Sequence, residues 1–126
     1  MAYNRNMNTR IKQTDYEMTD KVADYLDGRL AAIERMLGDD ADETRCEVEV
    51  GRATGRHKHS DYQYFAEIIV KRGAAPRLVA RNHEPSINAA IDNAKDEMLR
   101  QLRKEKTARK SKGRRDAGKA KRLIRS

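Results

Sequence analysis

The spacing of apolar residues changes twice along this chain, from a helical repeat to a strand repeat and back again. Residues 18–37 and 87–102 each carry an apolar stripe at intervals of three and four residues, which predicts two amphipathic helices. Between these stripes, Cys46, Val48 and Val50 alternate with polar residues, which predicts a strand with one buried face. Because each element must bury its apolar side against another one, the chain is restricted to a layered fold.

Short signals mark the ends of both predicted helices. Thr14 and Glu17 have the spacing of a capping box, so the first helix is predicted to begin at Thr14. Gly38 supplies the left-handed conformation that ends this helix, and a run of acidic residues follows. Proline suits the first turn of a helix and serine its cap, so Pro85 and Ser86 are predicted to open the last helix.

Four segments have the pattern of strands. A short alternation covers residues 6–12, and three further strands are predicted around residues 45–51, 62–71 and 77–83. The glycines and cations of residues 51–60 predict a mobile hairpin loop. The last three strands are therefore expected to form an antiparallel meander.

The aromatic residues of the longest predicted strand are divided between its two faces. Tyr62 and Tyr64 fall on the face predicted to be buried, whereas only Phe65 falls on the open face. RNA-binding sheets stack several bases on aromatic side chains, and one aromatic is too few for such a platform. The sequence therefore favours core packing for the two tyrosines.

The predicted order of elements is strand, helix, three strands, helix. We therefore predict an α+β fold, a two-layer sandwich in the order β-α-β-β-β-α, with a four-stranded sheet and both helices packed on one face. Residues 1–107 form this domain. The apolar stripe ends at Leu102, and the Ser, Gly, Lys and Arg content beyond it predicts a disordered basic C-terminal arm over residues 108–126.

Positive charge is concentrated in two parts of the chain. Residues 103–126 contain 12 basic and 2 acidic residues, whereas residues 1–102 contain 16 basic and 18 acidic ones. Within the body, residues 52–81 contain seven basic residues against two acidic ones. A polyanion is therefore the expected partner, approaching the middle hairpin and the C-terminus. The cations assigned to RNA binding on this basis are Arg56, Lys58, Lys71, Arg72, Arg77, Arg81, Arg109, Lys110, Lys112, Arg114 and Arg115.

The sequence has no Gly-rich phosphate loop, no Gly-x-Ser-x-Gly and no His-Glu-x-x-His, so no catalytic residue and no enzyme activity are expected. His57 and His59 flank Lys58 in the basic loop, which favours a solvated loop over a metal site. Cys46 lies on a buried strand face and is expected to be an inert core thiol. No cofactor, metal ion or small-molecule substrate is therefore expected.

Several features predict a cytoplasmic protein. No stretch is long and apolar enough to span a bilayer, and the first ten residues lack the pattern of a secretory signal. A single cysteine agrees with a reducing compartment. The basic arm lacks the aromatic and leucine face of an interfacial helix, so no membrane partner is expected.

Three segments carry a resemblance to a known family, namely residues 61–70 (DYQYFAEIIV), 78–80 (LVA) and 89–104 (AAIDNAKDEMLRQLRK). They resemble the ribosome hibernation promoting factor family, which includes the ribosome-associated inhibitor also called protein Y. The most specific part is Ala-Ala-Ile-Asp followed by Arg-Gln-Leu-Arg-Lys, and the likeness covers roughly residues 6–106. The chain resembles the short form of the family, without the second domain that pairs ribosomes.

The resemblance implies a β-α-β-β-β-α domain that acts in ribosome hibernation. Such a protein binds the small ribosomal subunit in the channel used by mRNA and tRNA, contacts rRNA and the ribosomal proteins that line this channel, and blocks the A and P sites. It inhibits translation in a stress response by occlusion, without catalysis. Matched positions imply rRNA contacts by Arg29 in the first helix and by Lys95, Arg100, Arg103, Lys104 and Lys106 in the last.

One stretch departs from the family pattern, and other functions stay open. Family members carry acidic residues and an aromatic one before the last helix, where this chain has Arg81, His83, Pro85, Ser86, Ile87 and Asn88. A ribosome assembly factor or RNA chaperone would share the charge and the fold, but should bind naked rRNA about as well as assembled subunits. A partner-binding module would bind without a strong dependence on salt.

Overall fold

The computed structural model describes residues 7–53 and 61–125, with side chains up to Arg109. In chain order the elements are β1 (Asn8–Thr14), α1 (Asp20–Leu37), the 3₁₀ helix η1 (Gly38–Glu43), β2 (Thr44–Arg52), β3 (Tyr64–Arg72), β4 (Leu78–Glu84) and α2 (Ile87–Arg125). The predicted order β-α-β-β-β-α is confirmed, with the first strand two residues later than expected.

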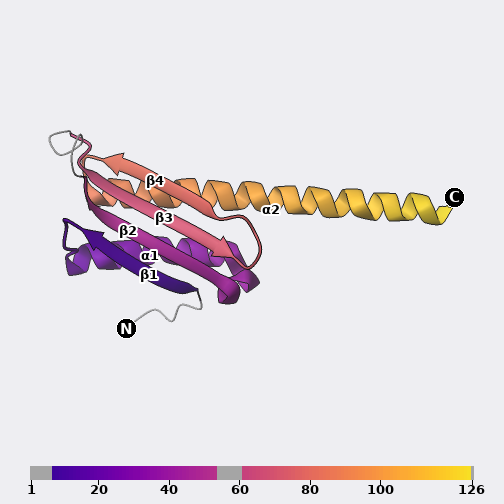
Figure 1. The fold of residues 1–126 in the computed structure, drawn as a ribbon, viewed down its shortest axis with the longest axis horizontal. Helices are drawn as coiled ribbons and strands as arrows, with labels where there is room; N and C mark the ends of the chain where they lie inside the picture. Colours follow the sequence, from indigo (N-terminus) through magenta and orange to yellow (C-terminus); the bar gives the residue numbers. More distant parts are fainter. Residues whose placement is uncertain (1–6, 54–60, 126) are drawn as a thin grey trace.

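The strands form one four-stranded mixed sheet in the order β1-β2-β3-β4 (Figure 1). β1 runs parallel to β2, as the helical crossover through α1 allows. β2, β3 and β4 form the predicted antiparallel meander. Both helices cover the same face of the sheet, so its other face is open and the two-layer prediction is confirmed.

The core lies between the helices and the covered face of the sheet. Alternate residues of β2, β3 and β4 point into it, because successive side chains of a strand point to opposite faces. These buried residues are Cys46, Val48, Val50, Ala66, Ile68, Val70 and Ala80. The buried stripe of α2 consists of Ile87, Ala90, Ile91, Ala94, Met98 and Leu102. The stripe predicted for the last helix is therefore the one that packs.

The start of α1 differs from the prediction. The helix begins at Asp20, and Thr19 caps it by accepting a hydrogen bond from the Val22 backbone N–H at 3.2 Å. Thr14 instead ends β1, where its hydroxyl donates to the Glu49 carboxylate at 2.6 Å. Pairing with β2 extends the first strand through Thr14, so tertiary strand pairing outweighs the local capping signal.

The predicted end of α1 and the predicted start of α2 are confirmed. Gly38 follows α1 with a φ of 57°, in the left-handed region that glycine adopts without steric strain. Ser86 accepts a hydrogen bond from the Ala89 backbone N–H at 3.1 Å and so caps the first turn of α2. Local capping signals therefore hold where no strand competes for the same residues.

The C-terminal part of α2 also differs from the prediction. The structure continues this helix to Arg125, in place of the disordered arm expected over residues 108–126. Alanine, lysine and arginine are strong helix formers, so a helix nucleated by packed turns propagates through this segment. Figure 1 shows α2 projecting beyond the end of the sheet. The domain boundary predicted after residue 107 falls inside this helix and stays a prediction.

Candidate nucleic-acid interface

Cations dominate the surface of α2 after its apolar stripe ends at Leu102. The side chains of Arg103, Lys104, Lys106 and Arg109 are all exposed. The helix holds these charges on a rigid rod, so a polyanion meets them without the entropy cost of ordering a flexible arm. The described cations predicted in this part of the chain therefore lie on successive turns of one helix.

The side of α2 that faces the body changes from apolar to ionic after Leu102. Glu105 contacts the Arg72 guanidinium at the end of β3, and Arg109 lies 3.7 Å from the Asp40 carboxylate in η1. Arg72 also reaches Asp40, at 3.4 Å. Because Arg72 is only 7% exposed, this cation fastens α2 to η1 and β3. Arg72 was predicted to bind RNA, but the structure places it in internal pairs and away from the exposed surface.

A second polar contact joins α1 to α2. Arg29 lies over the Tyr25 ring, 4.1 Å from its centroid, and donates to Asp92 at 3.1 Å. A hydrogen bond to Tyr25 raises the pKa of Arg29. Lys95 pairs with Asp96 at 2.5 Å, which raises the pKa of Lys95, and with Asp92 at 3.2 Å. Arg29 and Lys95, two of the six cations predicted from the resemblance, are thus held charged where α1 meets α2.

Arg100 is paired within its own helix but remains on the surface. It contacts Glu97 at 2.5 Å, and hydrogen bonding to Arg100 lowers the pKa of Glu97. The Arg100 side chain is 73% exposed, and ion pairs in water are weak, so a phosphate can replace Glu97 as its partner. Gln101 donates to the Val79 carbonyl oxygen of β4 at 2.9 Å, which anchors this turn to the sheet.

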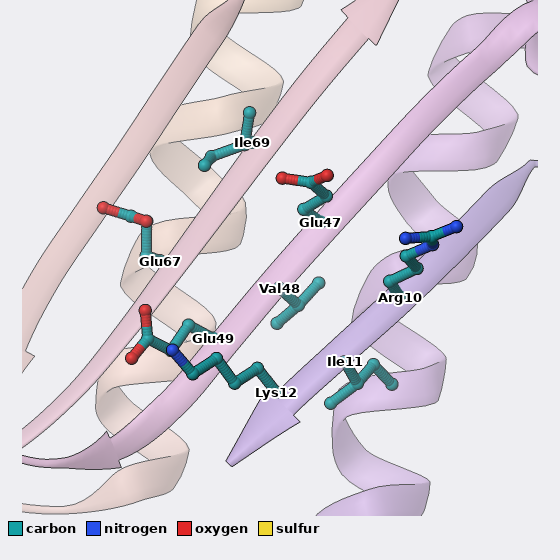
Figure 2. Close-up of a pocket in the computed structure, with 8 residues that line it drawn as sticks. All are labelled: Arg10, Ile11, Lys12, Glu47, Val48, Glu49, Glu67 and Ile69. Atoms are coloured by element: carbon teal, nitrogen blue, oxygen red, sulfur yellow. The ribbon is translucent and has the colours of Figure 1, made fainter. Parts of the chain in front are cut away.

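The open face of the sheet has an acidic centre (Figure 2). Glu47 and Glu49 on β2 and Glu67 on β3 line a hollow of about 320 Å³. Arg10 and Lys12 on β1 lie at its side. Glu49 is directly opposite Glu67 in the strand register. Arg10 stands directly opposite Glu47 and Lys12 opposite Glu49 in the register of β1 and β2, so these cations are balanced by carboxylates and the centre of this face offers phosphates no net attraction.

Two predicted cations at the edges of the open face make internal contacts. Arg81 on β4 pairs with Glu67 at 3.2 Å and lies over the Phe65 ring, 4.4 Å from its centroid. Phe65 points to the open face as predicted, yet it is only 3% exposed beneath this cover. Lys71 donates to the Ala75 carbonyl oxygen and so secures the turn after β3.

Arg77 belongs to a small group of cations at one end of the open face. It lines a hollow of about 250 Å³ together with Arg45, Lys71, Glu47 and Ile69. Arg45 lies directly opposite Lys71 in the strand register, and like charges in such positions repel. An anion bound between them would relieve this repulsion. The sequence prediction did not include Arg45, because only the register of the strands reveals its neighbour.

The predicted set is thus divided between several places. The cations of α2 share one helix, those of the sheet lie at the edges of the open face, and Arg72 is internal. Arg56 and Lys58 lie outside the described residues. The remaining predicted cations fall within the helical continuation of α2, and these are Lys110, Lys112, Arg114 and Arg115.

The sequence prediction also missed an arginine among tyrosines. The Arg52 guanidinium lies over the Tyr64 ring, 5.3 Å from its centroid, and donates to the Tyr64 hydroxyl at 3.0 Å. Tyr16 meets the same ring edge-on, at 6.0 Å between centroids. Tyr62 is 54% exposed, so its prediction as a core residue is wrong. The alternation did not apply to it because β3 begins only at Tyr64.

Within the part of the chain that the structure describes, no group of three His, Cys, Asp or Glu side chains is placed to hold a metal ion. Cys46 is buried in the core, as predicted. No helix among the described residues has the length and apolar character needed to cross a membrane.

Comparisons with known proteins agree on the fold. The family profile described as Sigma 54 modulation protein / S30EA ribosomal protein matches residues 9–110. Among curated proteins, none matches the chain by sequence. The Protein Y N-terminal domain from Thermus thermophilus is 25% identical with a TM-score of 0.61, covering 79% of this chain and 97% of that one. A ribosomal subunit interface protein from Coxiella burnetii has a TM-score of 0.63 over 80% and 99% of the two chains, and its 12% identity shows the fold alone.

Proposed function

We propose a ribosome-directed function for this chain, which belongs to the Sigma 54 modulation protein / S30EA ribosomal protein family. Membership in this family indicates a ribosome-associated protein. The finer proposal is that its domain occupies the mRNA and tRNA channel of the small subunit, contacts rRNA and the proteins lining the channel, and blocks the A and P sites. It then inhibits translation in the cytoplasm as a hibernation factor under stress, by occlusion and without catalysis.

One observation supports this proposal above the others, namely the exposed cations on α2. They are held on a helix whose base is buried and whose continuation carries further positive charge beyond the sheet. At 1.5 Å per residue, the helix beyond Arg109 spans about 24 Å. Each Lys or Arg that neutralises a phosphate releases counterions, so binding through this surface must weaken steeply with salt.

The distribution of charge also orients the domain. The centre of the open sheet face carries Glu47, Glu49 and Glu67, whereas α2 carries the exposed cations. We therefore expect α2 to face rRNA and the centre of the open face to lie away from phosphates. The folded body would exclude tRNA and mRNA by its volume, while α2 supplies the attraction.

Sedimentation of the purified protein with ribosomes and separated subunits tests the proposal. We expect it to pellet with small subunits and whole ribosomes at low salt, to be released at high salt, and to be excluded when tRNA and mRNA fill the channel. The double variant Arg103→Gln/Lys104→Gln should lower the slope of log affinity against log salt by about 1.5. Its matched control is Arg10→Gln/Lys12→Gln, which removes the same charge from the open face and should leave the slope nearly unchanged.

Three results would argue against this function. Binding that is unaffected by tRNA and mRNA, or equally strong to naked rRNA, would favour a ribosome assembly factor or RNA chaperone. An equal effect of the two double variants would mean that attraction follows net charge and not α2. Absence of any ribosome binding would leave only the fold in common with the family.

A further inference from the structure

We infer that Arg52, Tyr16, Tyr62 and Tyr64, here called the tyrosine cluster, bind an unpaired RNA base by stacking. The inference rests on the proposed function, because it assumes an RNA partner. It goes beyond that function by adding a base contact at the hairpin end of the sheet, on elements separate from the cations of α2. Stacking recognises single-stranded RNA, which charge alone does not distinguish from other polyanions.

Strand pairing brings the cluster together. Arg52 is directly opposite Tyr64 in the register of β2 and β3. The next pair is closed by a hydrogen bond from the Ala53 backbone N–H to the Gln63 carbonyl oxygen at 2.7 Å. Tyr62 follows this closed pair immediately along the chain. Arg52 at the end of β2 and Tyr62, two residues before the start of β3, therefore lie at the same end of the sheet.

Tyr64 holds its neighbours in fixed orientations. The Arg52 guanidinium lies over the ring face and its Nη2 donates to the ring hydroxyl at 3.0 Å, which fixes the group in two ways. Tyr16 meets the ring at an interplanar angle of 80°. Arg52 is exposed, so its charged group is offered to solvent beside the rings. Guanidinium groups and tyrosine rings are the surfaces on which RNA-binding proteins stack splayed bases.

Tyr62 supplies the exposed ring of the cluster. It is 54% exposed, and the other large apolar side chains exposed among the described residues are Ile11 at 46% and Val79 at 41%. Those two are aliphatic and have no π-face, so Tyr62 is the exposed side chain suited to stacking on a base. Tyr64 is only half-buried and packs against the core, so the cluster stands on a rigid support.

Acidic groups beside the cluster favour base contact over phosphate contact. Asp61 precedes Tyr62 in the chain, and Glu84 is opposite Tyr64 on the β4 side. Glu84 accepts a hydrogen bond from Asn93 at 2.6 Å, so it stays at the edge of the sheet. The cluster and the residues next to it in chain and register thus hold two carboxylates against one arginine, so they offer phosphates little net attraction. The aromatic surface is then what the cluster contributes to binding.

The chain has five Tyr and no Trp, so its intrinsic fluorescence reports on tyrosines alone. The probes are a short single-stranded oligoadenylate and an abasic RNA backbone of equal length, which keeps the phosphates but lacks bases. We expect the full chain to bind oligoadenylate about 5- to 150-fold more tightly than the abasic strand, with quenching of tyrosine fluorescence. The dependence of affinity on salt should be the same for both probes.

Four variants assign this preference to the cluster. Tyr62→Ala should remove most of the preference and the quenching, whereas Tyr62→Phe, which keeps an aromatic ring, should retain the preference. Arg52→Lys keeps the charge but loses the planar group, so the preference should fall while the salt dependence stays. Ile11→Ala removes an exposed side chain from β1 and should change neither. Circular dichroism checks that each variant is folded, which the exposure of all three positions leads us to expect.

Equal affinity for the two probes, or a preference that survives in Tyr62→Ala, would overturn the inference. Either result together with intact ribosome sedimentation would leave the proposed function standing. If the unmodified protein does not sediment with ribosomes, the proposed function is overturned, whatever its affinities for the two oligonucleotides. If the protein binds neither the oligoadenylate nor the abasic strand, the inference is also overturned, because the exposed cluster should be able to bind a base without the ribosome.

Discussion

The two parts of α2 form one continuous helix with opposite chemistry. Up to Leu102 it buries an apolar stripe against the sheet and α1, and between Arg103 and Arg109 its exposed charged side chains are all basic. Glu105 and Arg109 form an ionic seam with the body between these parts. Burial of the apolar part therefore sets the direction of the charged part, because both lie on one helix axis.

These ion pairs between α2 and the body determine where α2 lies more than they stabilise the fold. Burying a large apolar side chain contributes about 1.5–3 kcal/mol, so the stripe of α2 accounts for much of the docking. A buried ion pair gains little net free energy, because desolvation of both charges opposes their attraction. Arg72 with its two carboxylates therefore specifies where the apolar contact ends and how α2 leaves the body.

Removing a buried side chain from the packed part should have the largest effect. Met98 is fully buried, so Met98→Ala is expected to lower the free energy of unfolding by about 3 kcal/mol, through lost burial and the cavity left behind. Urea denaturation measures this change. Lys104→Ala, on the exposed side of α2, is the control and should change it by less than about 0.5 kcal/mol. Equal losses in the two variants would contradict the contrast between packed and projecting parts.

Removing the projecting part should change binding without changing stability. Truncation after Arg109 deletes eight basic residues and one acidic residue. We expect ribosome affinity at moderate salt to fall at least tenfold, or about 1.4 kcal/mol, with a shallower salt dependence. The thermal midpoint should stay the same, because the buried stripe is intact. A lower midpoint would show that the projecting part also supports the folded domain.

The smallest effect is expected at Asp92, which joins α2 to Arg29 of α1. Hydrogen bonding to Lys95, and then to Arg29, lowers the pKa of Asp92 below its ordinary value of 3.8. The resulting stability is present above that value and is lost as the pH falls through the lower folded pKa. Asp92→Asn should therefore cost about 0.5 kcal/mol at neutral pH, and this difference from the unmodified protein should vanish in strong acid.

Thermal midpoints between pH 2 and pH 6 measure this effect of Asp92. Asp24→Asn, on the exposed side of α1, removes the same charge outside this contact and serves as the control. If the Asp92 and Asp24 variants follow the same curve as the unmodified protein, the contact between α1 and α2 does not contribute to stability.

Local patterns predicted the elements well and their partners poorly. The stripe of α2, the alternation of β2 and the caps at Gly38 and Ser86 are confirmed, because each depends on neighbouring residues in the chain. The cap predicted at Thr14 and the burial predicted for Tyr62 are wrong, because both depend on where a strand begins or ends. Strand ends are set by the partner strand, which a single segment does not reveal.

The sequence predicted how much positive charge the chain carries, but not which cations are exposed and which are buried in ion pairs. Arg72 and Arg103 are alike in sequence, yet one is buried between carboxylates and the other is exposed on α2. Arg52 was missed because its tyrosine partner stands twelve residues later and becomes a neighbour only through the hairpin. The family profile places the chain in a family of ribosome-associated proteins, and it does not show which of these cations contact RNA.

The order of elements, most of the faces they bury and the concentration of positive charge near the C-terminus can all be read from the amino-acid sequence. This is possible because periodicity and composition act over a few neighbouring residues. Tertiary structure alone decided which cations are internal, where the acidic centre of the open face lies and how Arg52 meets the tyrosines. These features depend on contacts between segments distant in the chain, and the free energy of a charge depends on the groups that packing places around it.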